Sequence, residues 1–163
     1  MKQLIKVGMA DLKVSVSPNI LTTLGLGSCL GVILYDPIKK VGGLAHIMLP
    51  DINSVKLRHN KAKFANSAIE EMLDKMLRLG ASKQKMEAKI IGGAHMFAGV
   101  KVNDPPAFNV GERNIVSAKE ELAKQNIKLV AEDVGGDYGR SVEFDLETGK
   151  IKIRTIAWGL KEI

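Results

Sequence analysis

Short runs of apolar and β-branched residues, separated by polar and glycine-containing stretches, predict a series of β-strands in this chain. The predicted strands cover residues 12–16, 30–36, 41–49, 87–93, 127–133, 141–145 and 150–155. The triplet Glu-Thr-Gly at 147–149 lies between the last two runs and predicts a hairpin turn. The chain is therefore expected to be rich in β-structure.

Two further segments have the periodicity of amphipathic helices. Within residues 60–80, an apolar residue recurs at every fourth position, at Phe64, Ala68, Met72 and Met76. This Met- and Leu-rich side of the helix is interpreted as core packing, and Gly80 is suited to end the helix. A second helix is predicted over residues 112–126, where one side carries Ile115, Ala118 and Leu122.

The order of these elements predicts an α+β fold in a single domain spanning residues 1–163. Strands outnumber helices and do not strictly alternate with them, which disfavours a doubly wound α/β fold. A length of 163 residues suits one ordinary domain. No repeat, low-complexity segment or linker divides the sequence.

Composition narrows the classes of function. Hydrophobic residues make up 45% of the chain, as expected of a packed globular protein, and an aromatic content of 4% means that the core is mostly aliphatic. The formal net charge of +6 favours an acidic partner surface. Because the basic residues form no run of five or six and no aromatic stripe accompanies them, nucleic acid is not expected as a partner.

The compartment is expected to be the cytoplasm. No segment has the apolar run of a secretory signal, and none approaches the length of a membrane span. The chain has one cysteine, Cys29, which cannot form an internal disulfide. A lone thiol is typical of a compartment where thiols stay reduced.

That cysteine lies in the glycine-rich segment TTLGLGSCLG, residues 22–31. A dinucleotide-binding loop needs Gly-x-Gly-x-x-Gly before a helix, but the third glycine position holds Leu30 and a strand pattern follows. A P-loop needs Gly-Lys-Ser or Gly-Lys-Thr, which occurs nowhere in the chain. The segment 133–141 fails for the same reasons and is interpreted as a glycine-rich turn.

The strand pattern after Cys29 brings one histidine close to it. If the turn after Asp36 is tight, the two strands that it joins place Cys29 directly opposite His46, on the same face of an antiparallel pair. A turn longer by two residues keeps both side chains on that face as a diagonal pair. A slip of one residue would put them on opposite faces.

A thiol and an imidazole at this spacing predict nucleophilic chemistry. The imidazole would favour the thiolate of Cys29 and then protonate the leaving group. Backbone N–H groups around Gly27, Ser28 and Cys29 could stabilise an oxyanion, because glycine permits the required bend. The alternative is that Cys29 is a buried structural thiol and His46 a structural histidine. His59 and His95 carry weaker signals, no zinc-like spacing occurs, and no metal or cofactor is expected.

Several motifs resemble those of the CheD family of chemoreceptor glutamine deamidases. They are TLGLGSC at 23–29, GGLAHIMLP at 42–50, KIIGGAHMF at 89–97, NVGERN at 109–114 and GGDYGRSVEFDLETG at 135–149. The resemblance runs from about residue 5 to residue 155 and implies a Cys–His–Thr site. It assigns the nucleophile to Cys29, the base to His46 and the third member to Thr23, with Thr22 as the weaker candidate.

The resemblance also implies a fold, a substrate and partners. The fold would be an α/β sandwich of mixed and antiparallel sheets flanked by helices, similar to the catalytic domain of cytotoxic necrotizing factor. The substrate would be glutamine side chains on methyl-accepting chemotaxis receptors, converted to glutamate with release of ammonia through a thioester. The phosphatase CheC would be a further partner, and the membrane would be reached only through the receptors.

Three expectations beyond this main interpretation stay open at the level of sequence. A cysteine peptidase or acyl transferase would use the same thiol–imidazole pair, and a non-catalytic adaptor for receptors or CheC would leave Cys29 incidental. In the segment 92–99, Met96 and Phe97 stand between glycines and are expected to bind a partner. The alternative for Phe97 is that it turns inward and fills the core.

Overall fold

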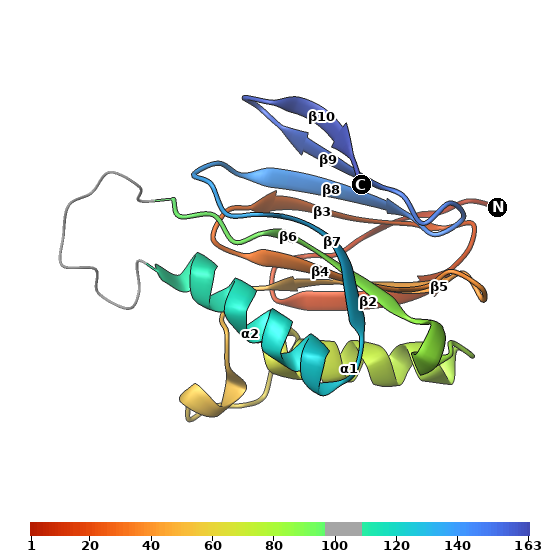
Figure 1. Cartoon of the computed structure of the whole chain (residues 1–163), viewed down its shortest axis with the longest axis horizontal. Helices are drawn as coiled ribbons and strands as arrows, with labels where there is room; N and C mark the ends of the chain where they lie inside the picture. Colours follow the sequence, from red (N-terminus) through yellow and green to blue (C-terminus); the bar gives the residue numbers. More distant parts are fainter. Residues whose placement is uncertain (97–108) are drawn as a thin grey trace.

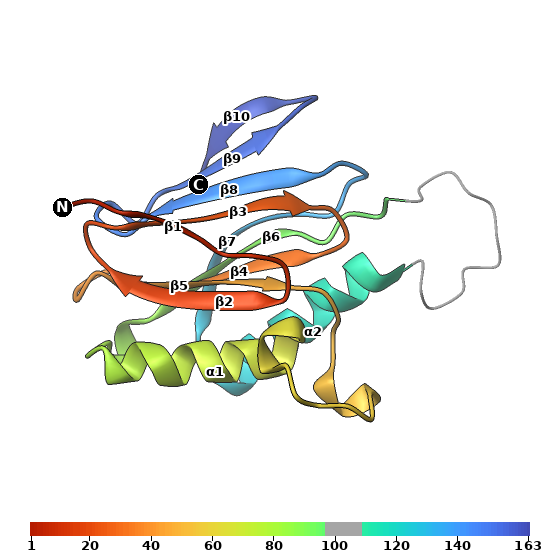
Figure 2. The same cartoon turned by 180° about the vertical axis from the view of Figure 1, so that it is seen from behind.

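A computed structural model describes residues 1–96 and 109–163 of the chain. Figures 1 and 2 show two stacked β-sheets with both α-helices on one outer side of the stack. The first sheet has the order β1 (Leu4–Lys6), β3 (Ile20–Leu26), β8 (Arg140–Asp145), β9 (Ile151–Thr155) and β10 (Gly159–Glu162). The second has the order β2 (Asp11–Val16), β5 (Val41–Ile47), β4 (Leu30–Asp36), β6 (Glu87–Gly92) and β7 (Lys128–Val134).

Both sheets are mixed. In the first sheet β1 and β3 are parallel, and in the second β6 and β7 are parallel, while the other neighbouring strands within each sheet run antiparallel. Strands β3 and β4 follow one another in the chain but belong to different sheets. The chain therefore crosses between the layers at residues 27–29, the segment that holds the cysteine.

Helices α1 (Ala65–Arg78) and α2 (Val110–Lys124) cover one face of the second sheet (Figure 1). Their apolar sides pack on that sheet in one core, to which α1 contributes Met72 and Met76. Gly43 of β5 allows this close approach, because a Cβ there would lie 2.6 Å from Met72 Cγ. Gly80 follows α1 at a φ of +96°, and Ala81 N–H bonds Met76 O, so the predicted helix end is confirmed.

A second core fills the space between the two sheets. Leu44 of β5 and Phe144 of β8 are fully buried there, and the rings of Tyr35 and Phe144 pack edge to face at 5.3 Å. Gly42 lets the sheets approach, because a Cβ on it would clash with a Leu146 methyl group. The site described below lies at one end of this inter-sheet layer.

Three short 3₁₀ helices, η1 (Ile52–Ser54), η2 (Lys61–Lys63) and η3 (Lys83–Lys85), complete the described elements. Within the described residues, no helix combines the length and the apolar composition needed to cross a bilayer.

The predicted α+β class, the seven strands, the two helices and the turn at 147–149 are all confirmed, with small shifts at their ends. One expectation is corrected, because the helices cover one face of one sheet rather than flanking the sandwich. A strand outside the predicted set is also present. The first half of the glycine-rich segment is strand β3, because Thr22 and Thr23 are β-branched and Gly25, at a φ of +69°, lies in a local irregularity of the strand.

Candidate active site

Cys29 lies in the crossing from β3 to β4, where hydrogen bonds hold the backbone carbonyls of the crossing segment. The Gly27 carbonyl accepts Ala94 N–H at 2.9 Å, and the Cys29 carbonyl accepts Gly93 N–H at 2.9 Å. Gly92 makes this approach possible, since its φ is +106° and a Cβ there would lie 2.6 Å from the Cys29 carbonyl oxygen. The segment after β6 thus supports the cysteine-bearing segment.

The turn between β4 and β5 sets how Cys29 and His46 are related. Asp36 pairs with Val41, so four residues form the turn, and Cys29 does not lie directly opposite His46 as a tight turn would place it. The turn is longer because the buried Asp36 carboxylate accepts N–H groups from Ile38 and Lys39. The register is the longer alternative weighed above, which places Gly31 opposite His46 and leaves the cysteine diagonal to it.

Cys29 and His46 face the same inter-sheet layer. Cys29 is 9% exposed and belongs to the inter-sheet core, and His46 is 1% exposed and bonds a residue of the opposite sheet. Gly31 has no side chain to fill the space across from the imidazole, where a Cβ would meet Leu26 at 3.1 Å. The predicted placement of both side chains on one face is therefore confirmed.

Thr23 of β3 is the residue that His46 contacts across the layers. Thr23 Oγ1 lies 2.8 Å from His46 Nδ1 and 2.8 Å from the Val7 carbonyl oxygen. A carbonyl only accepts, so the single hydroxyl hydrogen of Thr23 goes to Val7 and the imidazole must donate from Nδ1. In the neutral ring this leaves Nε2 as an unprotonated acceptor, the form that a general base needs.

Burial keeps this pair neutral. Desolvation lowers the pKa of His46 below its ordinary 6.5. Desolvation also raises the pKa of the Cys29 thiol above its ordinary 9.0, and the hydrogen bond from the residue's own N–H offsets part of that rise. Desolvation acts against the charged form of both groups. The expectation that the imidazole favours the thiolate therefore stays a prediction. His46 Nε2 is buried and has no hydrogen-bond partner among the described residues.

The other predicted residues have different surroundings. Met96 is half-exposed, and its Cγ lies 3.4 Å from where a Cβ of Gly27 would be, so it borders the cysteine segment. Phe97 lies outside the described residues. His95 donates its N–H to Gly136 O and lines a cavity of about 290 Å³ beside the start of α2. His59 is exposed on the segment before η2.

Two contributors to the site were missed by sequence reasoning. Val7 holds the Thr23 hydroxyl through its carbonyl, a backbone role that side-chain identity does not reveal. Asn114 of α2 donates from Nδ2 to the Ser28 carbonyl at 3.0 Å and to the Met48 carbonyl at 3.1 Å. The motif NVGERN, which ends at Asn114, was the available signal. In the described part of the chain, no three His, Cys, Asp or Glu side chains are grouped as metal ligands would be.

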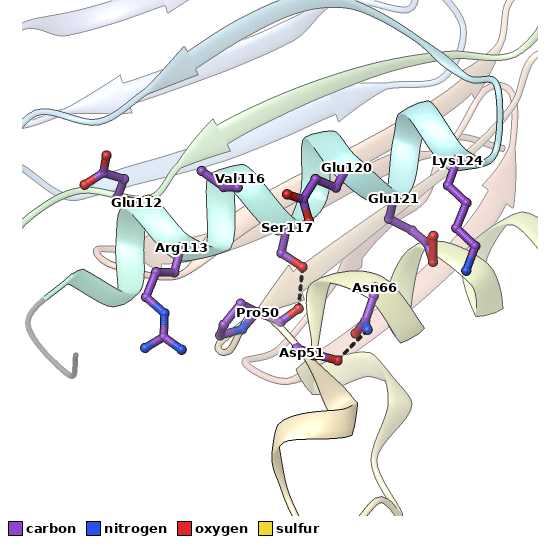
Figure 3. Close-up of a pocket in the computed structure, with 10 residues that line it drawn as sticks. All are labelled: Pro50, Asp51, Asn66, Glu112, Arg113, Val116, Ser117, Glu120, Glu121 and Lys124. Atoms are coloured by element: carbon purple, nitrogen blue, oxygen red, sulfur yellow. Dashed lines mark hydrogen bonds between the residues drawn. The ribbon is translucent and has the colours of Figure 1, made fainter.

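A groove of about 570 Å³ lies beside the same helix (Figure 3). It runs between α2 and the segment that follows β5, where Ser117 Oγ donates to the Pro50 carbonyl at 2.6 Å and Asn66 Nδ2 donates to Asp51 at 2.7 Å. Neither Cys29, His46 nor Thr23 lines it. These two bonds hold the segment after the histidine strand against both helices.

The sequence of this chain is similar to those of known proteins over most of its length. Residues 48–155 match the family model described as CheD chemotactic sensory transduction. The probable chemoreceptor glutamine deamidase CheD of Caldanaerobacter subterraneus subsp. tengcongensis is 50% identical over 161 residues, covering 99% of this chain and 98% of that protein. The chain belongs to the CheD family.

Other CheD proteins are similar over nearly their whole length. The chemoreceptor glutamine deamidase CheD of Halalkalibacterium halodurans is 46% identical over 164 residues, covering 100% of both chains. The probable deamidase of Pyrococcus abyssi is 46% identical over 155 residues, covering 95% of this chain and 93% of that one. Among solved structures, the hypothetical protein YfiH of Bacillus licheniformis aligns with a TM-score of 0.45 at 13% identity, over 76% of this chain and 49% of that chain. A likeness at that level carries no argument.

Proposed function

We propose that this chain is a chemoreceptor glutamine deamidase that hydrolyses glutamine side chains to glutamate and ammonia, the activity named for its CheD relatives. The observation that carries the proposal is the bond between His46 Nδ1 and Thr23 Oγ1. That bond leaves Nε2 as a free base on the face that also holds Cys29. A nucleophile, a base and a group that orients the base are the parts that amide hydrolysis through a covalent intermediate requires.

In the first half of the reaction, the Cys29 sulfur attacks the carboxamide carbon as its proton passes to His46 Nε2. The carbonyl electrons move to oxygen, and the resulting oxyanion accepts a hydrogen bond from the Cys29 N–H, with those of Gly27 and Ser28 as further candidates. When the intermediate collapses, the C–N bond breaks and the imidazolium gives its proton to the departing nitrogen. Ammonia leaves, and a thioester to Cys29 remains.

In the second half, His46 is again the base. It takes a proton from water as the oxygen attacks the thioester carbon, and it returns that proton to sulfur as the C–S bond breaks. The products are a glutamate side chain and the free thiol. Thr23 takes no proton in either half, because its role is to hold the imidazole in the tautomer with the hydrogen on Nδ1.

Docking to receptors is the next part of the proposal. The net charge of +6 suits an acidic helical receptor surface, and the exposed segment 56–61 contributes Lys56, Arg58 and Lys61. This segment adjoins the site, since Asn60 Nδ2 bonds the Ala10 carbonyl and Ala10 N–H bonds the His46 carbonyl. The basic segment thereby offers a docking surface next to the base.

The proposal extends to a second partner, the compartment and the fold. CheC would be a second partner, with Met96 and Phe97 as contacts. Residues 1–163 would form one domain that acts in the cytoplasm. The catalytic domain of cytotoxic necrotizing factor would share the fold.

The decisive experiment incubates the protein with a receptor fragment and follows the fragment by mass spectrometry. We expect a gain of about 1 Da at specific glutamines, with ammonia released, and no change with Cys29→Ala at an unchanged melting temperature. Cleavage of the fragment would indicate a peptidase, and a larger adduct would indicate an acyl transferase. Binding without any mass change would indicate an adaptor, and deamidation by Cys29→Ala would disprove the nucleophile.

A further inference from the structure

We propose that Asn114 is a positioning residue that aims the Cys29 N–H at the oxyanion formed when Cys29 attacks a carbonyl carbon. The proposal rests on the proposed function, since it concerns the same site, but it can be tested without a receptor. It assigns a role in the reaction to helix α2, which contributes neither the nucleophile nor the base.

The side chain of Asn114 joins the two chain segments that carry those groups. It is fully buried, and its Nδ2 donates to the Ser28 carbonyl at 3.0 Å and to the Met48 carbonyl at 3.1 Å. Because carbonyls only accept, this orientation of the amide is the one that makes both bonds. Leu30 pairs with Ile47 at the end of the β4–β5 ladder, so Asn114 links the two chain segments that extend beyond this last pair, at Ser28 and Met48.

The bond to Ser28 controls the direction of the next N–H. The Ser28–Cys29 peptide is planar and trans, so its C=O and N–H point in opposite directions. Since Asn114 holds the carbonyl toward α2, the Cys29 N–H points away from α2. That N–H belongs to the same residue as the attacking sulfur, so it lies close to the atom that attacks. An oxyanion on the attacked carbon would form within its reach.

Among the three carbonyls of residues 27–29, the one of Ser28 is held by a side chain. Backbone N–H groups of Ala94 and Gly93 hold the other two. A substitution at position 114 therefore releases one peptide plane and leaves the backbone bonds around it in place. The Oδ1 of Asn114 is buried without a hydrogen-bond partner in the described residues, a cost that argues for a role of the amide beyond filling space.

The test compares two reagents that modify Cys29. The ester p-nitrophenyl acetate acylates the thiol through an oxyanion, whereas iodoacetamide alkylates it by direct displacement and forms none. The variants are Asn114→Ala and, as a matched control, Ser117→Ala, which removes another side-chain bond from α2 to a backbone carbonyl, that of Pro50 (Figure 3). Melting temperatures and deamidation of the receptor fragment are measured on the same samples.

For Asn114→Ala we expect acylation and kcat for deamidation to fall about tenfold to hundredfold, while alkylation stays within about twofold. Ser117→Ala should leave all three rates within about twofold. Equal loss of acylation and alkylation, unchanged acylation, or failure of the wild-type protein to be acylated would each overturn the proposal. If wild type is acylated and Asn114→Ala shows the expected selective loss, but no receptor glutamine is converted, the proposed function fails while the positioning role stands.

A second variant covers the case in which Asn114→Ala does not fold. Asn114→Ser keeps a short donor that can bond its own helix but cannot reach both carbonyls. The same selective loss of acylation is expected for it. If neither variant folds, Asn114 is required for folding and the positioning role is refuted.

Discussion

Two neighbouring threonines of β3 differ in what they hold. Both are buried and both donate to a backbone carbonyl, Thr22 to Val142 at 2.7 Å and Thr23 to Val7 at 2.8 Å. Successive residues of a strand point to opposite faces, so Thr23 meets the inter-sheet layer and His46, while Thr22 lies on the other face of its sheet. The adjacent pair is a matched test of the tautomer argument.

Thr23→Val should reduce kcat for deamidation about tenfold or more, within the range that acid–base catalysis contributes. The reason is that Nδ1–H loses its acceptor, so the ring no longer favours the tautomer with a bare Nε2. Thr22→Val should keep kcat near the wild-type value. Steady-state kinetics with melting curves for both variants are the measurement, and equal losses in the two variants would contradict the assignment.

The pH dependence follows from the two shifted pKa values. Burial lowers the pKa of His46, so the imidazole is protonated only at a pH lower than its ordinary 6.5. The acid limb of kcat/KM should therefore lie below pH 6.5. Because burial raises the pKa of Cys29, alkylation by iodoacetamide should have its midpoint above pH 9.0. Profiles of both rates against pH decide this. An acid limb above 6.5, or an alkylation midpoint in the neutral range, would mean that the site is more hydrated than described.

The sequence predicted which residues form the site better than it predicted the contacts between them. Cys29 and His46 were placed on one face by counting along two strands, and the resemblance singled out Thr23. The register was not fixed, because the length of the turn depends on the Asp36 carboxylate binding two N–H groups. The contacts of Asn114 were out of reach, since the motif that ends at this residue does not indicate which distant carbonyls its amide meets.

At the scale of elements, the end of β6 supports the cysteine segment. Gly92 and Gly135 both adopt positive φ, at +106° and +80°, yet a Cβ would strike the Cys29 carbonyl oxygen from Gly92 and meet nothing within 4 Å from Gly135. An alanine at either position would be strained by the positive φ, but only an alanine at position 92 would also clash with the Cys29 carbonyl.

Gly135→Ala should lower the free energy of unfolding by about 1 kcal/mol, the cost of the left-handed backbone for alanine. Gly92→Ala should cost more, and it should also reduce deamidation because Cys29 must move. Denaturant unfolding together with kcat measures both effects. Similar losses of stability, with activity retained by both variants, would refute the role assigned to Gly92.

Element prediction succeeded where a local pattern was strong and failed where distant partners decide. The stripe of α1 and the run of β4 carry their own signal. Strand β10 is exposed throughout and lies at the edge of its sheet beside β9, so burial gives it no apolar pattern. Strand β3 was hidden because its glycines, needed for the crossing between sheets, suggest a loop.

At the scale of the whole molecule, exposed lysines lie at both ends. The segment 56–61 lies at the end of the molecule from which α2 starts, and η3 lies at the other end (Figure 1). Each carries two lysines in a short stretch, Lys56 and Lys61 in one and Lys83 and Lys85 in the other. Replacing either pair of lysines by glutamates changes the net charge by the same amount. A difference between the two double variants therefore reports docking at one place rather than attraction by the net charge of the protein.

Lys56→Glu with Lys61→Glu should raise KM for the receptor fragment about tenfold and leave kcat near the wild-type value, because docking weakens while the site is untouched. Lys83→Glu with Lys85→Glu should raise KM much less. The difference should shrink as salt is added, since screening weakens surface attraction. Kinetics at two ionic strengths measure this, and equal effects of the two double variants would rule out a localised docking surface.

The pairing of β3 with β8 has a consequence for when the site can exist. Thr23, Cys29 and His46 all lie within the first 46 residues, so a ribosome makes them early. Yet Thr23 pairs with Val142, and the carbonyl of Ser28 is held from residue 114. A nascent chain therefore carries all three side chains long before it carries the strand and the helix that arrange them. The reactive arrangement forms only near the end of translation, so a growing or truncated chain has a cysteine but no enzyme.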